Sequence, residues 1–105
     1  MEILNTERTK LNNTIELIGE SSENNILIVG VVHGDEPQGK YLIEEYLKTH
    51  YNFLSNSDLS PSSKSPISRR GTLFIPCLNP DGLQLNRRTN ANNVDINRNF
   101  PTKNW

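Results

Sequence analysis

One stretch of the sequence, ILIVGVVHGDEPQ at residues 26–38, decides the expected fold. Residues 26–32 are continuously apolar and rich in β-branched side chains, which is typical of a strand covered on both faces of a parallel or mixed sheet. From Pro37 to about His50, apolar positions repeat at helical spacing, and charged residues occupy the other face. The stretch therefore predicts a buried strand that leads directly into an amphipathic helix.

The flanking segments extend this unit. Residues 14–19 alternate weakly and end on glycine, which predicts a strand with one solvated face, and residues 71–78 resume an apolar strand pattern. Residues 52–70 are rich in Ser, Asn and Pro, which predicts a flexible surface loop, and residues 79–105 show no further regular element. The order strand, helix, strand predicts an α/β crossover unit whose loops gather at the carboxyl ends of the strands.

Composition limits the classes of function. With 105 residues and a net charge of -1, the chain is expected to form one small unit without general attraction to nucleic acid or membranes. No apolar run could span a bilayer and no signal-peptide pattern opens the chain, so we expect a cytoplasmic protein. The apolar content of 33% predicts a thin core, and Cys77 is expected to be a small buried hydrophobe.

Two candidate metal ligands follow the predicted strand. His33 and Glu36 place an imidazole and a carboxylate three residues apart on a turn that enters the helix. Zinc accepts this pair, and a catalytic zinc has three protein ligands with one position left for water. On these residues alone an alternative stays open, in which Asp35 or Glu36 caps the helix and His33 is an ordinary loop histidine.

A second set of motifs lies downstream. NPDG at residues 79–82 is followed by Arg88 and by VDINRNFP at residues 94–101. Together with HGDE at residues 33–36, these motifs resemble those of the zinc carboxypeptidase family, and within it the bacterial murein tripeptide amidases. The resemblance runs from about residue 26 to residue 105, apart from the Ser-rich loop. It implies that residues 1–105 are a single incomplete catalytic domain, the N-terminal part of an α/β/α sandwich with a mixed sheet.

The resemblance also implies roles for individual residues. His33 and Glu36 become zinc ligands, Arg88 polarises the scissile carbonyl and stabilises its oxyanion, and Asn97 with Arg98 holds the carboxylate of the substrate. A planar guanidinium suits that last role, because its donors match a carboxylate bidentately.

Three neighbouring residues are given structural roles. Arg87 is expected to be a solvated loop arginine, and Asp95 is expected to order its loop through backbone hydrogen bonds. Asn93 stands where the family usually has glycine, and asparagine tolerates a positive φ, so we expect the turn to survive.

The mechanism of the family further needs a third ligand, a histidine downstream of Arg98, and a later glutamate as general base. The remaining histidine, His50, is expected to sit at the helix C-terminus, and no glutamate follows Arg98. We therefore expect this chain to need a complementing C-terminal segment, and not to hydrolyse peptides alone.

The leading hypothesis is a zinc-dependent hydrolase of a peptide or amide bond beside a free carboxylate, acting on murein peptides. A deacylase resembling aspartoacylase or succinylglutamate desuccinylase shares the same motifs. A non-catalytic remnant or binding module is the alternative from another class.

Overall fold

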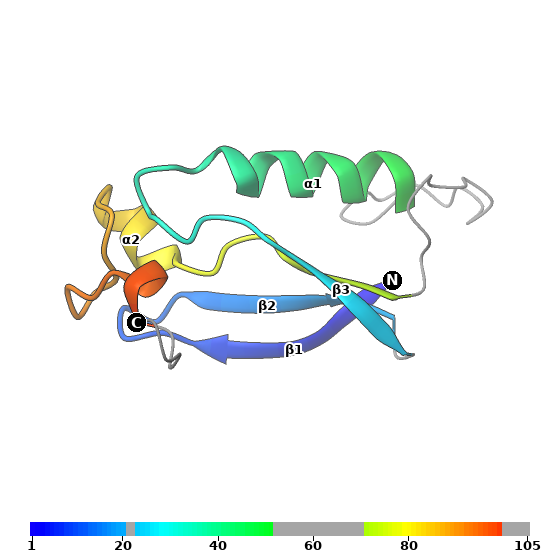
Figure 1. The fold of residues 1–105 in the computed structure, drawn as a ribbon, viewed down its shortest axis with the longest axis horizontal. Coiled ribbons are helices and arrows are strands. Elements are labelled where there is room, and N and C mark those ends of the chain that lie inside the picture. Colours follow the sequence, from blue (N-terminus) through cyan, green and yellow to red (C-terminus); the bar gives the residue numbers. More distant parts are fainter. Residues whose placement is uncertain (21–22, 52–70, 100–105) are drawn as a thin grey trace.

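The computed structural model of the chain describes residues 1–20, 23–51 and 71–99 (Figure 1). The elements, in chain order, are β1 (Glu2–Arg8), β2 (Thr14–Gly19), β3 (Asn24–Val29), α1 (Gln38–Tyr51), β4 (Gly71–Ile75), α2 (Pro80–Leu85) and the 3-10 helix η1 (Ile96–Arg98). The loop predicted at residues 52–70 lies outside the described residues, and so does the end of the downstream motif at residues 100–101.

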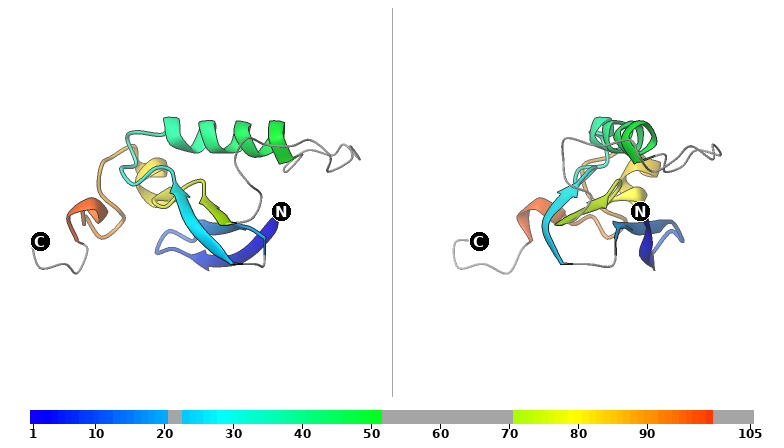
Figure 2. Two further views of the ribbon diagram at one scale, coloured as in Figure 1. Left: turned by 45° about the vertical axis from the view of Figure 1, so that its right-hand side comes forward. Right: turned by 90° about the vertical axis from the view of Figure 1, so that its right-hand side faces the viewer.

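The four strands form one mixed sheet in the order β1-β2-β4-β3. β1 with β2 and β2 with β4 are antiparallel, whereas β3 and β4 are parallel, with Ile28 opposite Phe74. Parallel neighbours need a crossover connection, and α1 lies in that connection, along one face of the sheet (Figure 2). The predicted α/β unit with a mixed sheet is therefore confirmed.

The core lies between α1 and the centre of the sheet. It consists of Ile18 from β2, Phe74 from β4, and Ile43 and Leu47 from α1. Ile43 and Leu47 are four residues apart, so they point to the same side of the helix. Tyr41 and Leu42 belong to the same helical pattern of apolar residues in the sequence, but they are 57% and 71% exposed. The buried stripe of α1 is narrower than its sequence pattern indicated.

β3 is an edge strand, and the expectation that it is covered on both faces is wrong for the described residues. Ile26 and Leu27 are 49% and 55% exposed, and among the described strands β3 pairs with β4 alone. The apolar run identified the strand correctly. It could not identify the neighbours, because burial is a property of the packed sheet.

Two regions that were expected to be irregular form helices. Asn79 caps α2 by accepting a hydrogen bond from the Gly82 amide (3.0 Å), and Pro80 follows as the first helical residue. Asp95 caps η1 in the same manner. The sequence did not indicate these helices, because the same residue types begin both turns and short helices. None of the helices in the described part of the chain is long and apolar enough to cross a membrane.

Strand β1 was not predicted. Its residues, EILNTER, show neither clear alternation nor a strong apolar run, and six of the seven are exposed. Pairing with β2 stabilises the strand, so its existence depends on a partner that sequence periodicity does not reveal.

Asp81 connects α2 to the hairpin between β1 and β2. It is 3% exposed and accepts hydrogen bonds from the Thr9 hydroxyl, the Leu11 amide (3.1 Å) and the Asn13 side chain (2.9 Å). Burial alone would raise the pKa of Asp81, but these three donors outweigh it and lower the pKa below its ordinary value. The ionised carboxylate therefore stabilises the contact between the hairpin and α2.

Replacing Asp81 with alanine should lower the free energy of unfolding by about 1–3 kcal/mol at neutral pH, because the buried donors lose their acceptor. Since the pKa is lower in the folded state, this stabilisation is present above the ordinary aspartate pKa and is lost as the pH falls through the folded value. Urea unfolding at decreasing pH should show the difference from wild type narrowing. Asp35→Ala, which removes an exposed carboxylate, is the control. A difference that widens on acidification would contradict this account.

Candidate functional site

The candidate site lies where β3 and β4 end, at their carboxyl ends. Backbone pairing continues beyond both strands, since the Gly30 amide bonds to Ile75 O and the Asn79 amide bonds to Val31 O, each at 2.9 Å. Gly34 then lies directly against α2, where an added Cβ would be 2.1 Å from the carbonyl carbon of Gly82. Glycine is needed at residue 34 because the predicted ligand turn packs backbone against backbone.

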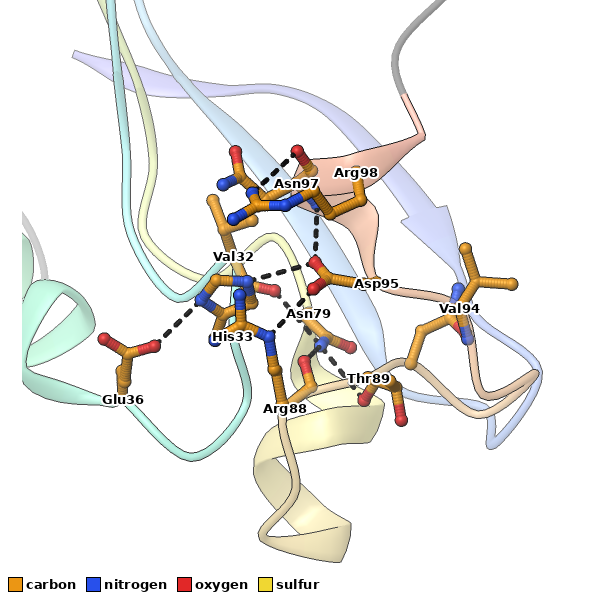
Figure 3. Close-up of polar contacts among 11 residues, drawn as sticks. Val32, His33, Glu36, Asn79, Arg88, Thr89, Val94, Asp95, Asn97 and Arg98 are labelled. Atoms are coloured by element: carbon orange, nitrogen blue, oxygen red, sulfur yellow. Dashed lines mark hydrogen bonds and ion pairs between the residues drawn. The ribbon is translucent and has the colours of Figure 1, made fainter. Parts of the chain in front are cut away.

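His33 lies between two carboxylates (Figure 3). Its Nδ1 is 2.8 Å from Glu36 Oε2, and its Nε2 is 3.0 Å from Asp95 Oδ1. Asp95 can accept the Nε2 proton, which leaves Nδ1 as the ring atom available to a metal. A cation held between Nδ1 and Glu36 Oε2 would take the place of the direct contact between these two atoms. The donor set, one imidazole nitrogen and one carboxylate oxygen, suits zinc.

Asp95 links His33 to Arg88, and the sequence did not indicate this link. The Nε of Arg88 donates to Asp95 Oδ2 at 2.8 Å, and the Asn97 amide donates to Asp95 Oδ1 at 3.0 Å. The backbone role expected for Asp95 is therefore present, but it is only part of its function. The hydrogen bond from Arg88 lowers the pKa of Asp95, helped by His33, and the same bond raises the pKa of Arg88. Both groups therefore stay charged and hold each other in place.

Asn97 and Arg98 belong to η1, which Asp95 attaches to the rest of the site. Both residues are exposed, and Arg98 Nη1 donates to the Asn97 carbonyl at 3.4 Å. Figure 3 shows them beside Asp95, above the His33 ring. The structure thus brings together all five residues that the motifs single out, which are His33, Glu36, Arg88, Asn97 and Arg98.

The loop before Asp95 is closed by asparagines. Asn93 has a φ of 61°, as expected for a residue that replaces glycine in a left-handed turn. Asn90 accepts hydrogen bonds from the Asn92 and Val94 amides, each at 2.9 Å. Arg87 donates to the Asn90 carbonyl at 2.7 Å and is half-buried, so the expectation of a solvated arginine is wrong.

The profile of the zinc carboxypeptidase family matches residues 4–105. The chain belongs to the zinc carboxypeptidase family. Murein peptide amidase A of Escherichia coli K12 is 40% identical over 85 residues, which cover 81% of the chain and 28% of that protein. Carboxypeptidase SOL1 of Arabidopsis thaliana is 40% identical over 73 residues, which cover 70% of the chain and 14% of that protein. The chain therefore spans less than a third of these relatives.

Two solved structures are similar to the fold of this zinc carboxypeptidase chain. The murein-tripeptide amidase of Escherichia coli O157 matches all of it, with a TM-score of 0.69 and 34% identity, over 41% of the amidase. A succinylglutamate desuccinylase/aspartoacylase of Rhodobacter sphaeroides matches 86% of it, with a TM-score of 0.51 and 25% identity, over 24% of that chain.

A third side chain that could complete a metal site with His33 and Glu36 is not found in the part of this zinc carboxypeptidase chain that the structure describes. No three His, Cys, Asp or Glu side chains lie there as a group that could hold a metal. His50 is in the last turn of α1, as expected, with its ring 4.6 Å from that of Tyr46. Glu44 pairs with Lys40 at 3.0 Å along the same helix. His33 and Glu36 remain the predicted pair of zinc ligands.

Replacing Asp95 with asparagine should weaken zinc binding about 10–100-fold, the usual cost of losing a group that orients a histidine ligand. The amide has one acceptor oxygen and cannot serve His33 and Arg88 as the carboxylate does. Competition with a chromophoric chelator would measure the affinity, using the complete product of the gene that encodes this chain. Asp35→Asn changes a neighbouring exposed carboxylate and should leave the affinity unchanged. Equal affinities in all three proteins would exclude an orienting role for Asp95.

Proposed function

We propose that this chain provides two zinc ligands and the substrate-binding groups of a hydrolase that cleaves a peptide or amide bond beside a free carboxylate in murein peptides. The observation that carries the proposal is the position of His33, with Glu36 at one ring nitrogen and Asp95, which is itself bound by Arg88, at the other. His33 and Glu36 would hold zinc, which supplies a Lewis acid when it is bound.

Arg88 and Arg98 are proposed to contact different parts of the substrate. Arg88 is half-exposed and oriented by Asp95 through Nε, so the ends of its guanidinium can donate to the scissile carbonyl and to the negative charge that develops on it. Arg98, with Asn97 beside it, would bind the free carboxylate by charge-assisted hydrogen bonds. The separation of the two arginines along the loop lets one act on the reacting bond while the other holds the end of the substrate.

Murein peptides are the proposed substrate because two amidases named for them share sequence and fold with the chain. The deacylase alternative rests on the similarity to a desuccinylase/aspartoacylase, which is weaker in both TM-score and identity. In either case the third ligand and the general base would come from outside residues 1–105, on the same polypeptide or on a complementing segment.

The test is hydrolysis by the complete gene product of a murein tripeptide substrate, of the same substrate with its carboxylate amidated, and of an N-acyl amino acid. Preference for the free murein peptide supports the proposal, and preference for the acyl amino acid supports the deacylase. If the zinc-loaded protein hydrolyses none of the three substrates, the result favours the hypothesis that the chain is a non-catalytic remnant or a binding module.

Arg98→Ala should reduce kcat/KM for the free carboxylate about 10–100-fold, because a hydrogen bond to a charged group contributes about 1.5–3 kcal/mol. The reduction should be nearly absent for the amidated substrate, which has no carboxylate to bind. Steady-state kinetics on both substrates measures the coupling between residue and carboxylate. An equal reduction of kcat/KM for both substrates would show that Arg98 does not bind the free carboxylate.

A further inference from the structure

Asn79 is almost fully buried and its side chain is fully engaged. It is 2% exposed. Its Oδ1 accepts from the Gly82 amide, which fixes the orientation of the side chain, so the two N–H groups of Nδ2 face the other way. They are directed at three backbone carbonyls, those of Val32 (3.2 Å), Thr89 (3.3 Å) and Arg88 (3.4 Å). Figure 3 shows the amide between these segments. Capping α2 needs only the oxygen, so the donors serve another purpose.

The first of these carbonyls belongs to a strained turn. Val31 has a φ of 55°, a left-handed conformation that β-branched residues avoid, and it is 5% exposed. Such a conformation persists only where the surroundings hold it. The Asn79 backbone amide bonds to Val31 O at 2.9 Å, while its side chain bonds to Val32 O. Asn79 therefore holds both carbonyls that immediately precede His33.

The other two carbonyls belong to the loop that carries the arginine. Arg88 O accepts from Asn79 and also from the Gly34 amide, at 3.4 Å in each case. The side chain of Arg88 is directed at Asp95, while its backbone is held against the His33 turn. One buried amide thus contacts the backbone on both sides of the site.

We propose that Asn79 is a positioning residue, which sets the distance and orientation of the His33 turn relative to Arg88. The expected effect of Asn79 on catalysis rests on the proposed function, whereas its expected effect on the backbone does not. Asn79 touches no reacting atom. Its expected contribution is therefore to kcat, through the alignment of the metal-binding and carbonyl-binding groups, because small displacements of such groups are costly.

Two variants separate the role of the Nδ2 donors of Asn79 from the role of its Oδ1 as the cap of α2. Asn79→Ser keeps a capping oxygen for α2 and loses the long amide, and Asn79→Asp keeps both the size and the capping oxygen but cannot donate. The matched control is Asn13→Ala. It removes two side-chain hydrogen bonds to α2, to Asp81 (2.9 Å) and Gln84 (2.8 Å), without touching Val32 or Arg88.

The measurements are steady-state kinetics and amide hydrogen exchange on the zinc-loaded complete gene product. We expect Asn79→Ser to lower kcat about 10–100-fold with KM changed less than about threefold, and to speed exchange at residues 31–36 and 87–89. Asn13→Ala should change neither. If Asn79→Ser unfolds, Asn79→Asp is measured instead.

Exchange that is the same in the Asn79 variants and in Asn13→Ala would overturn the proposal, and so would full recovery of kcat in excess zinc. If the wild type hydrolyses nothing, the proposed function fails. The exchange comparison still decides whether Asn79 positions the two segments.

Discussion

His33→Ala is expected to lose bound zinc and at least about 1,000-fold in kcat/KM, because a metal Lewis acid contributes several kcal/mol to transition-state stabilisation and about 1.4 kcal/mol corresponds to a factor of ten. His33 is one of the two proposed zinc ligands, and its Nδ1 lies 2.8 Å from Glu36 Oε2, the other proposed ligand. Elemental analysis and hydrolysis of a murein tripeptide by the complete gene product are the measurements.

His50→Ala is the matched control, because it removes the only other histidine of the chain, in the last turn of α1. It should keep its zinc and remain within about twofold of wild-type kcat, because the last turn of α1 is at the opposite end of the helix from His33. Zinc retained by His33→Ala and lost by His50→Ala would reverse the assignment. Zinc retained by both would place the metal outside this chain.

The second large effect concerns Arg88. We expect Arg88→Ala to lower kcat about 100–1,000-fold with little change in KM, the usual cost of losing a donor that stabilises charge formed only in the transition state. The structure favours this role over substrate anchoring. The guanidinium is held at Nε by Asp95, which also contacts His33, so its remaining donors are fixed beside the proposed metal ligand.

Arg88→Lys tests whether geometry or charge matters. Lysine keeps the positive charge, but its single ammonium cannot bind Asp95 with one nitrogen and present two others to the substrate. The kcat of Arg88→Lys should therefore exceed that of Arg88→Ala by less than about tenfold. Single-turnover measurements would separate the chemical step from binding. An increase of KM at unchanged kcat in Arg88→Ala would show instead that this arginine binds the ground state.

Much of the fold could be predicted because its signals are local. β2, β3, α1 and β4, which are 5 to 14 residues long, were expected from their local sequence patterns, and α1 starts one residue after Pro37. The parallel pairing of β3 with β4 followed from the helix between them. β1 and the edge position of β3 could not be predicted, because both depend on which strands pair.

The candidate site divides in the same way. The sequence by itself determined the chemical groups: an imidazole and a carboxylate three residues apart on a turn, two arginines with an asparagine downstream, and an asparagine able to replace glycine at residue 93. Residue type and short spacing carry that information, because backbone conformation over a few residues is set by local sterics and hydrogen bonding.

Only the tertiary structure decided how these groups act on one another. Asp95 meets His33 across 62 residues, and the Asn79 side chain meets Val32 across 47. Such contacts have no periodicity in the sequence. They exist because two parallel strands end side by side and bring their following loops within hydrogen-bonding distance, where burial makes each unpaired polar group costly.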